Sequence, residues 1–531
     1  MPLNGVEVLE TVRDCAQSPD VEIKSVEDAL SIINIMDTLG YADIIEAGFA
    51  GAHPIYDTIT REATQMGLSA KVATFGRLRA PNTSVDDFSR NPFIKYILDL
   101  NTPVVVLVYK SWDYQVPTVG ATLDENLKML EDTVRFFVKH GKEVIADAEF
   151  ATGAFLGKIQ KGVEPNLEYL LYSMRIAKEA GARKIVLCDT EGKILPPNVG
   201  PLVNAAITAL GDRKYVGFHG HDDHDVGSAN NYLAIMSGVS HVQTTFLGHG
   251  ERTGNVSSIN MLGLLTSPYQ SNPLKFDMTR FKEAAEVIHL LLTGRRLPSD
   301  TPFVGNNAFT HKGGMHGDGN LKLDDAYNAR DPAEFGNKEI YPITDQGGTA
   351  HVALALGLDK RDQVVRKVYE AAMGLVDEGY KLEQYPAFLK LLAARAREGY
   401  QPPFKIIEDA LDESSHDGTV SDYARFKVDV NGQLYKIKKA QGAGPVDAII
   451  KPLETILRRH FSLPTFDFRF ETDTIRGKKS SQVVLGEASF IVPNGDIPKV
   501  YTMPGISSSI TQAGIKAITA GLEYMILQGK H

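Results

Sequence analysis

KIVLCDT (184–190) and YVGFHGH (215–221) are short apolar stretches that end in polar residues, and each precedes a segment with helical character. This pattern predicts a buried strand that leads into a helix. Eight such strand–helix units in roughly 270 residues match the count and size of a (β/α)8 barrel. The other six strand candidates before residue 286 are VEVLETVR (6–13), ADIIEAG (42–48), KVATFG (71–76), PVVVLVYK (103–110), KEVIADAE (142–149) and HVQTTFLG (241–248).

The segments between these strands carry the start and stop signals of helices. SVEDALSIINIMDTLG (25–40) is one, and TLDENLKMLEDTVRFFVKHG (122–141) opens on a threonine followed by acidic residues and closes on a glycine. A doubly wound sheet is the rival arrangement, but it usually has a Gly-rich phosphate-binding turn after its first strand. That position reads RDCAQSP (13–19). We therefore predict an α/β fold with a TIM barrel over residues 1–285.

After residue 285 the regular alternation of predicted strands and helices ends. Residues 286–420 are predicted to form an accessory, linker-like region with helices at 362–377 and 382–398, and its polar end at 400–420 reads as a linker. Residues 421–531 are predicted to form a C-terminal α/β domain with an Asn431-Gly432 hairpin turn and an internal pseudo-repeat. Its closing helix, 507–527, has an apolar face that so small a module would not bury alone, so we expect pairing with a second copy.

Composition narrows the class of protein further. The chain has 531 residues, of which 43% are hydrophobic and 23% charged, and a net charge of −10. These values are ordinary for a globular protein, and an acidic chain without Lys/Arg blocks is a poor partner for nucleic acid or an anionic membrane surface. No run approaches the ~18 apolar residues of a membrane span. With no signal peptide and only two cysteines, we expect a cytoplasmic protein.

Polar side chains stand at the end of nearly every predicted strand, where a barrel places its active site. Such groups bind metals, carboxylates or protons, and a purely structural barrel gives no reason for them to gather there. They are Arg13, Asp14, Glu46, Lys110, Asp147, Glu149, Asp189, Thr190, His219, His221, Glu251, Arg252 and Asn255.

His219-Gly220-His221 is the sharpest of these signals. Residues two apart on a strand point to the same side, so both imidazoles reach one ion. Asp14, at the end of the first strand, would complete a set of two histidines and one carboxylate, which suits a divalent metal with open positions for substrate. The alternative is that these are ordinary polar residues beside a loop.

The neighbouring residues suggest roles around such a metal. Arg13 is a fixed cation able to stabilise an oxyanion on a substrate carbonyl. Asp147 and Glu149 share a strand face, so one could bind Arg13 and the other transfer a proton, or both could close the rim with a salt bridge. Thr190 is suited to a substrate carboxylate, or to a capping role. Cys188 reads as a buried barrel residue rather than a nucleophile.

Six motifs, in order along these strand ends, resemble the DRE-TIM metallolyase superfamily. Within it, the chain is similar to the Claisen-condensing synthases of citramalate, 2-isopropylmalate and homocitrate. Residues 110–149, 442–454 and 507–526 favour the citramalate-synthase-like branch. The six motifs are VRDCAQ (12–17), DAE (147–149), VLCDTEG (186–192), FHGHDD (218–223), GHGERTGN (248–255) and FTHKGGMHGDGN (309–320).

The resemblance implies a divalent metal, namely Mg, Mn or Zn. Its ligands would be Asp14, His219 and His221, with Asn255 as a further ligand. Arg13 would bind the substrate and polarise its ketone.

The resemblance also implies roles for residues around the metal and after the barrel. Glu149 would hold or assist the arginine. His316 would be the catalytic acid–base histidine, supported by Asp318. The 2-oxoacid would be bound by Arg13, Asp147, Thr190 and Asn320.

The activity implied is an acyltransferase that condenses acetyl-CoA with a 2-oxoacid in branched-chain amino-acid biosynthesis, with pyruvate favoured and citramalate the product. The alternatives are 2-isopropylmalate or homocitrate synthesis, a metal-dependent lyase or aldolase on the same barrel, or a metal-binding barrel without catalysis. The C-terminal domain resembles the family's LeuA dimer-type regulatory domain. This implies a homodimer or higher homo-oligomer, with isoleucine or leucine as an effector.

Overall fold

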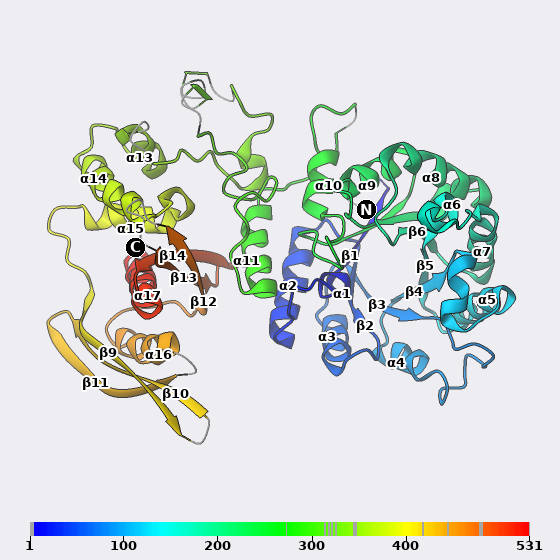
Figure 1. Cartoon of the computed structure of the whole chain (residues 1–531), viewed down its shortest axis with the longest axis horizontal. Coiled ribbons are helices and arrows are strands. Elements are labelled where there is room, and N and C mark those ends of the chain that lie inside the picture. The colour runs from blue at the N-terminus through cyan, green and yellow to red at the C-terminus, as the bar shows by residue number, and fades with distance from the viewer. Residues whose placement is uncertain are drawn as a thin grey trace. The chain divides into compact units, whose positions relative to one another are not determined.

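A computed structural model of the chain (Figure 1) divides into two compact units. The first comprises Met1–Phe281 and Leu291–Thr293, and the second comprises Lys282–Leu290 and Gly294–His531. The structure describes residues 5–529 apart from 272, 313–314, 317–318, 320–321, 324–325, 344–347, 417–418, 443–444 and 477–481.

The first unit is a closed parallel barrel in which β1 to β8 follow one another in sequence order and β8 pairs back onto β1. This confirms the predicted TIM barrel, with each strand inside or within two residues of its expected range. The strands are β1 (Glu7–Thr11), β2 (Ile44–Phe49), β3 (Lys71–Arg77), β4 (Val104–Lys110), β5 (Glu143–Glu149), β6 (Lys184–Asp189), β7 (Val216–Gly220) and β8 (His241–Thr244).

Capping side chains mark the starts of helices around the barrel, as the sequence predicts. Thr122 accepts a hydrogen bond from the backbone N–H of Glu125 at the start of α5, and Ser25 caps α2 in the same way. The helices of this unit are α1 (Val12–Cys15), α2 (Val26–Leu39), α3 (Pro54–Gln65), α4 (Pro92–Leu100), α5 (Leu123–Lys139), α6 (Ala151–Leu156), α7 (Leu167–Ala180), α8 (Pro196–Leu210), α9 (Gly227–Met236) and α10 (Ser258–Leu265).

Buried aliphatic side chains fill the barrel interior, so it is a packed core and not a pore. Polar residues at the strands' carboxyl ends line a cavity above this core. The cluster comprises Leu9, Ile44, Ala73, Phe75, Val104, Val106, Ile145, Val186 and Cys188.

The second unit contains helices and two antiparallel three-stranded sheets, ordered β11-β10-β9 and β12-β13-β14. Each sheet is followed along the chain by one helix, α16 or α17, as the predicted pseudo-repeat requires. The strands are β9 (Phe404–His416), β10 (Thr419–Val430), β11 (Gln433–Gly442), β12 (Asp467–Arg476), β13 (Gln482–Val492) and β14 (Lys499–Ser507). The helices are α13 (Gly348–Leu356), α14 (Gln363–Glu378), α15 (Pro386–Arg395), α16 (Pro445–Leu457) and α17 (Ile510–Gln528), and α11 (Phe281–Thr293) has residues in both units.

Hairpin geometry confirms the predicted turn between β10 and β11. Val430 pairs with Gln433, which leaves Asn431 and Gly432 as a two-residue loop. Both loop residues have positive φ, 50° and 85°, as a type I′ turn requires.

The prediction of a linker at 400–420 is wrong, because most of this stretch forms β9 and pairs with β10. Its polar composition concealed the strand, since a ladder of backbone hydrogen bonds does not require apolar side chains at every second position. The α/β module therefore begins with β9 at Phe404 and not near residue 421.

The argument that α17 needs a second copy of the chain to cover its apolar face is also wrong. Residues around α17 contribute to two buried clusters of the second unit. Ile518 and Leu522 belong to one cluster, while Ala520 and Tyr524 belong to the other, which contains residues of α14 and α15. The accessory helices thus supply the cover that the module lacks alone.

Across the described residues, no helix is both long enough and apolar enough to cross a membrane.

Candidate active site

Two imidazoles and a carboxylate meet at the carboxyl end of the barrel. His219 lies on β7 and His221 just beyond it, and their Nε2 atoms are 3.3 Å apart. Asp14 lies in the short helix α1 after β1, where Thr11 Oγ1 accepts a hydrogen bond from its backbone N–H. Asp14 Oδ2 is 3.8 Å from His219 Nε2. Adjacent ligands of an octahedral ion with ~2.1 Å bonds lie about 3 Å apart, so this spacing is of the right order for a shared ion.

Asn255 joins this group from the loop after β8. Its Nδ2 is 3.5 Å from Asp14 Oδ2 and 3.4 Å from His219 Nε2. Its Oδ1 is buried without a hydrogen-bond partner among the described residues. Because the oxygen and nitrogen of an amide exchange places by a flip about the side chain, the orphan oxygen is available to a cation at this point.

The electrostatics of the two histidines suit metal binding. Burial lowers the pKa of His219, and burial together with the neighbouring His219 lowers the pKa of His221 to about 4. Both rings are therefore neutral near pH 7, and two imidazole nitrogens at this separation need a proton or a cation between them. Within the described part of the chain, no three His, Cys, Asp or Glu side chains stand as a ready-made metal shell, so the ligand set stays a prediction.

Arg13 is held rigidly beside these residues. Its Nε donates to Glu46 Oε1 at 2.9 Å, its guanidinium forms an ion pair with Asp14, and its Cζ lies 3.9 Å from the centre of the Phe75 ring. Burial opposes its charge, but the carboxylates of Asp14 and Glu46 more than offset burial and raise the pKa of Arg13. Thr11 donates to the same Glu46 oxygen at 2.7 Å. The arginine is thus a fixed, permanent cation.

The two carboxyl groups of β5 have partners other than the expected Arg13. Glu149 forms an ion pair with Lys110, so the expectation that Glu149 holds the arginine is not met. Asp147 Oδ1 accepts a 2.9 Å hydrogen bond from Gln243 Nε2. Burial, and then the charge of Glu46, raises the pKa of Asp147 well above its usual value, so this carboxyl keeps its proton to higher pH than an exposed aspartate.

Thr190 accepts a hydrogen bond from the backbone N–H of Phe150 at 2.9 Å, which leaves its own hydroxyl proton free to donate. Phe150 has a φ of 64°, an unusual backbone conformation for a bulky residue. The Arg252 Nη2 donates to the Thr190 carbonyl at 2.9 Å, and the same guanidinium binds Asp223. Thr190 therefore holds the backbone at Phe150, and its hydroxyl proton is still able to bind a substrate.

A cavity of about 770 Å³ opens at this rim, within the usual ~300–1,000 Å³ of ligand pockets. The structure brings seven of the predicted site residues to its walls, and Asn255 lies behind them. The seven are Arg13, Asp14, Asp147, Glu149, Thr190, His219 and His221.

The three predicted site residues that follow the barrel in the sequence are His316, Asp318 and Asn320. His316 belongs to the second unit, where its ring stacks on Tyr327 with centroids 4.2 Å apart. Its place in the active site therefore stays a prediction. Asp318 and Asn320 lie outside the described residues.

Two partners of the site were not assigned from the sequence. Glu46 was visible as the polar end of the second strand, but nothing in the sequence paired it with Arg13. Gln243 lies in the middle of a strand that reads as apolar, and only the closed barrel brings it to Asp147.

Sequence models of three protein families match this chain along its length. The HMGL-like model matches residues 7–288, which span the barrel. The homocitrate synthase post-HMGL domain-like model matches residues 303–379, and the LeuA allosteric (dimerisation) domain matches residues 385–526. The chain therefore belongs to the HMGL-like family and has the two further domains beyond the barrel.

Three relatives are similar to this chain over nearly its whole length. The chain is 31% identical to an (R)-citramalate synthase of Sulfolobus acidocaldarius, over 98% of this chain and 97% of the relative. It is 30% identical to an (R)-citramalate synthase of Synechocystis, over 97% of this chain and 94% of the relative. A third (R)-citramalate synthase, from Streptomyces coelicolor, is also 30% identical, over 98% and 96%.

Proposed function

We propose that this protein is an acyltransferase that condenses acetyl-CoA with pyruvate to give (R)-citramalate and free CoA. The observation that carries the proposal is the end-to-end similarity to several (R)-citramalate synthases, in a chain whose barrel gathers the polar residues described above. The same chemistry with a different 2-oxoacid would give 2-isopropylmalate or homocitrate, so the identity of the 2-oxoacid is the finer part of the proposal.

The residues that fit a divalent metal are Asp14, His219, His221 and Asn255. An Mg, Mn or Zn ion there would supply Lewis-acid polarisation of the 2-oxoacid, and both neutral imidazoles have a lone pair available. Arg13 adds a second positive group, fixed by Glu46 and the Phe75 ring, where the ketone oxygen develops negative charge. The Thr190 hydroxyl donates to the substrate carboxylate.

Proton transfers complete the reaction. A base takes a proton from the acetyl methyl group, and the resulting carbanion forms a carbon–carbon bond with the ketone carbon. The ketone oxygen then gains a proton, and water cleaves the thioester to release CoA. We assign acid–base roles to His316, supported by Asp318, and to the two carboxyl groups of β5. Asp147 suits proton transfer because burial raises its pKa, so its carboxyl keeps a transferable proton to higher pH than an exposed aspartate.

The rim of the cavity offers positive charge for the phosphate groups of acetyl-CoA. Arg77, at the end of β3, and Arg90, in the following loop, both line the cavity. Neither has an ion-pair partner within the described residues, whereas the neighbouring Arg79 is bound by Glu125 and Asp132. We therefore propose Arg77 and Arg90 as the phosphate-binding groups.

The LeuA-type domain extends the proposal beyond the barrel. We infer that the chain acts in the cytoplasm as a homodimer and that isoleucine or leucine inhibits it through residues 385–526. The support is the matched allosteric (dimerisation) domain, and not the face of α17, which is buried within its own chain.

Release of CoA is the decisive assay. The purified chain is incubated with a divalent metal, acetyl-CoA and, separately, pyruvate, 2-oxoisovalerate and 2-oxoglutarate. We expect CoA release with pyruvate and identification of the product as citramalate by mass spectrometry. Preference for either other 2-oxoacid would move the assignment to 2-isopropylmalate or homocitrate synthesis. No CoA release with any of the three, together with cleavage of a hydroxyacyl substrate, would replace condensation by lyase chemistry.

A further inference from the structure

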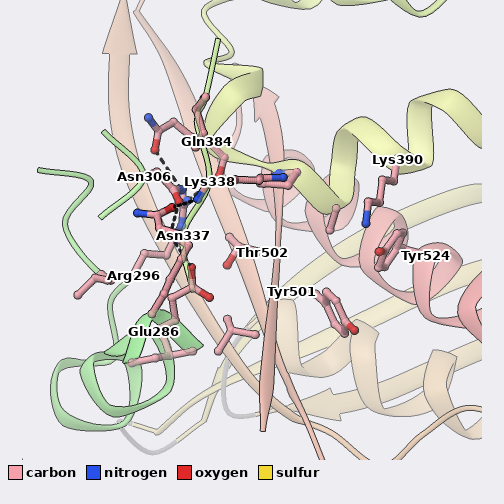
Figure 2. Close-up of a pocket in the computed structure, with 17 residues that line it drawn as sticks. Glu286, Arg296, Asn306, Asn337, Lys338, Gln384, Lys390, Tyr501, Thr502 and Tyr524 are labelled. Carbon is pink, nitrogen blue, oxygen red and sulfur yellow. Dashed lines mark hydrogen bonds and ion pairs between the residues drawn. The ribbon is translucent and has the colours of Figure 1, made fainter. Parts of the chain in front are cut away.

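A second cavity, of about 240 Å³, lies wholly within the second unit (Figure 2). Its walls come from α11, from the segment between α11 and α13, from Gln384 just before α15, and from α15, β14 and α17. The volume lies below the ~300–1,000 Å³ of drug-sized pockets, so its occupant would be small. None of these residues belongs to the barrel cavity.

The walls of this cavity have an excess of positive charge. Among the described residues on the walls, Glu286 is the one carboxylate, and it lies 3.3 Å from one of the cations, Lys282. A second cation, Arg296, is paired at 2.5 Å with Glu487. The four cationic lining residues are Lys282, Arg296, Lys338 and Lys390.

The remaining two cations, Lys338 and Lys390, have no hydrogen-bond or ion-pair partner for their ammonium groups within the described residues. Burial of its ammonium group, followed by the charges of Lys390 and Lys282, lowers the pKa of Lys338, while Glu286 acts in the opposite direction. Lys282, Lys390 and Glu286 thus all lie close enough to act on the charge of Lys338. Both lysines are exposed to solvent at the cavity. Like charges on the walls of one cavity repel one another, and a bound anion would relieve that repulsion.

Neutral hydrogen-bond donors lie on the same walls. Tyr501 and Thr502 come from β14 and Tyr524 from α17, and Figure 2 shows Lys390 beside Tyr524. The rings of Tyr501 and Tyr524 are 5.3 Å apart at their centroids. Neither phenol hydroxyl is bonded to any described residue, so both remain free to donate to a ligand.

We propose that this cavity is a binding site for a small oxyanion, a phosphate or carboxylate group, held by Lys338 and Lys390 with the hydroxyl groups of Tyr501 and Tyr524 as further donors. The site is separate from the barrel reaction. Its two lysines belong to different domains, since Lys338 lies in the region matched by the post-HMGL domain and Lys390 in the LeuA domain. A bound anion would tie these two domains together.

The test is isothermal titration of the full chain, freed of metal with EDTA, with inorganic phosphate and separately with malonate at constant ionic strength. Three proteins are compared: the wild type, Lys338→Gln/Lys390→Gln, and the control Lys360→Gln/Lys405→Gln. The control removes the same charge from exposed positions of the second unit that do not line the cavity. We expect one anion site per chain that depends on the two lysines, besides any anion bound by Arg77 and Arg90 at the barrel rim. The Kd of this site should rise at least tenfold in the cavity variant and stay within twofold of the wild type in the control.

Hydrogen exchange gives a second measurement. Added anion should protect the amides of Lys499–Thr502, at the start of β14, in the wild type and not in the cavity variant. Tyr501→Phe serves if the double lysine variant does not fold, and it should lose part of the affinity. If only one of the two probes binds, the site is supported and its ligand is identified as a phosphate or as a carboxylate. No saturable binding of either probe, unchanged binding in the cavity variant, or equal loss in the control would overturn the proposal.

Discussion

At the scale of single residues, the metal group rests on His219. Removing its imidazole takes one of the two histidines from the proposed set, and Asp14, His221 and the neutral amide of Asn255 should hold a divalent ion less tightly. We expect His219→Ala to lose its bound metal, as measured by mass spectrometry after gel filtration. Its rate of CoA release should fall by at least about 100-fold. Its circular dichroism should match the wild type, because the barrel core is aliphatic.

The control for this experiment is His140→Ala, at the exposed end of α5. It should retain metal and turnover. Full metal content and full activity in His219→Ala would mean that the ion binds elsewhere.

Glu10 gives a prediction about stability. Its carboxyl group is fully buried on β1, where Oε2 accepts hydrogen bonds from Ser258 at 2.5 Å and Thr244 at 3.2 Å. Burial raises its pKa to about 7. Between the usual pKa of a glutamate, about 4.5, and 7 the unfolded chain loses this proton while the folded chain keeps it, so stability falls by roughly 3 kcal/mol as pH rises.

Glu10→Gln removes that titration. Its amide oxygen still accepts from Ser258 and Thr244, and no charge forms at high pH. Relative to the wild type, the melting temperature of the variant should therefore be higher at about pH 8 than at about pH 5. A constant difference in melting temperature across this range would show that the carboxyl does not titrate there.

The same residues show which features of the site the sequence predicts. Strand-end position places Asp14, His219 and Asp147 together, because all parallel strands of a barrel end at one rim. Hydrogen bonds across the rim are not encoded by local pattern. The pairing of Arg13 with Glu46, and of Glu149 with Lys110, depends on side-chain directions that only the closed barrel defines.

At the scale of elements, β3 and the loop after it supply Arg77 and Arg90 at the cavity rim, neither of which has an ion-pair partner in the described part of the chain. Hydrogen bonds to charged groups contribute about 1.5–3 kcal/mol each, so loss of both should raise KM for acetyl-CoA at least tenfold. We expect Arg77→Gln/Arg90→Gln to leave kcat and the KM for the 2-oxoacid within about twofold of the wild type.

Steady-state kinetics with each substrate varied in turn provide the measurement. The control is Arg213→Gln/Lys214→Gln, just before β7 and hence at the opposite end of the barrel. An unchanged KM for acetyl-CoA in the rim variant would place the CoA phosphates elsewhere.

The elements also show where pattern reading fails. The barrel strands are apolar runs in sequence order, so local signals suffice to find them. The strand β9 is partly polar and depends on its partner β10, 419–430, for its backbone hydrogen bonds. Its existence is therefore a property of the sheet and not of the segment.

At the scale of the whole molecule, the second unit combines what the sequence divides into an accessory region and a regulatory domain. One buried cluster contains Val368 of α14, Leu389 of α15 and Tyr524 of α17, so these helices and the module share a core. Long-range packing of this kind leaves no mark on local periodicity. It also means that removal of the tail would expose apolar surface of the accessory helices, so regulation is best tested on the full chain.

The last prediction concerns that full chain. Light scattering should give twice the 58.1 kDa of one chain, because the C-terminal region matches a dimerisation domain. Isoleucine or leucine, added separately to the CoA-release assay, should lower the rate, and alanine at the same concentration should not. A coupling free energy of about 1–3 kcal/mol corresponds to a 5- to 150-fold change in affinity between the inhibited and active states. Inhibition therefore requires that the amino acid bind one state more tightly than the other. A dimer that neither amino acid inhibits would make residues 385–526 a dimerisation module alone, and a monomer at assay concentration would contradict the proposed assembly.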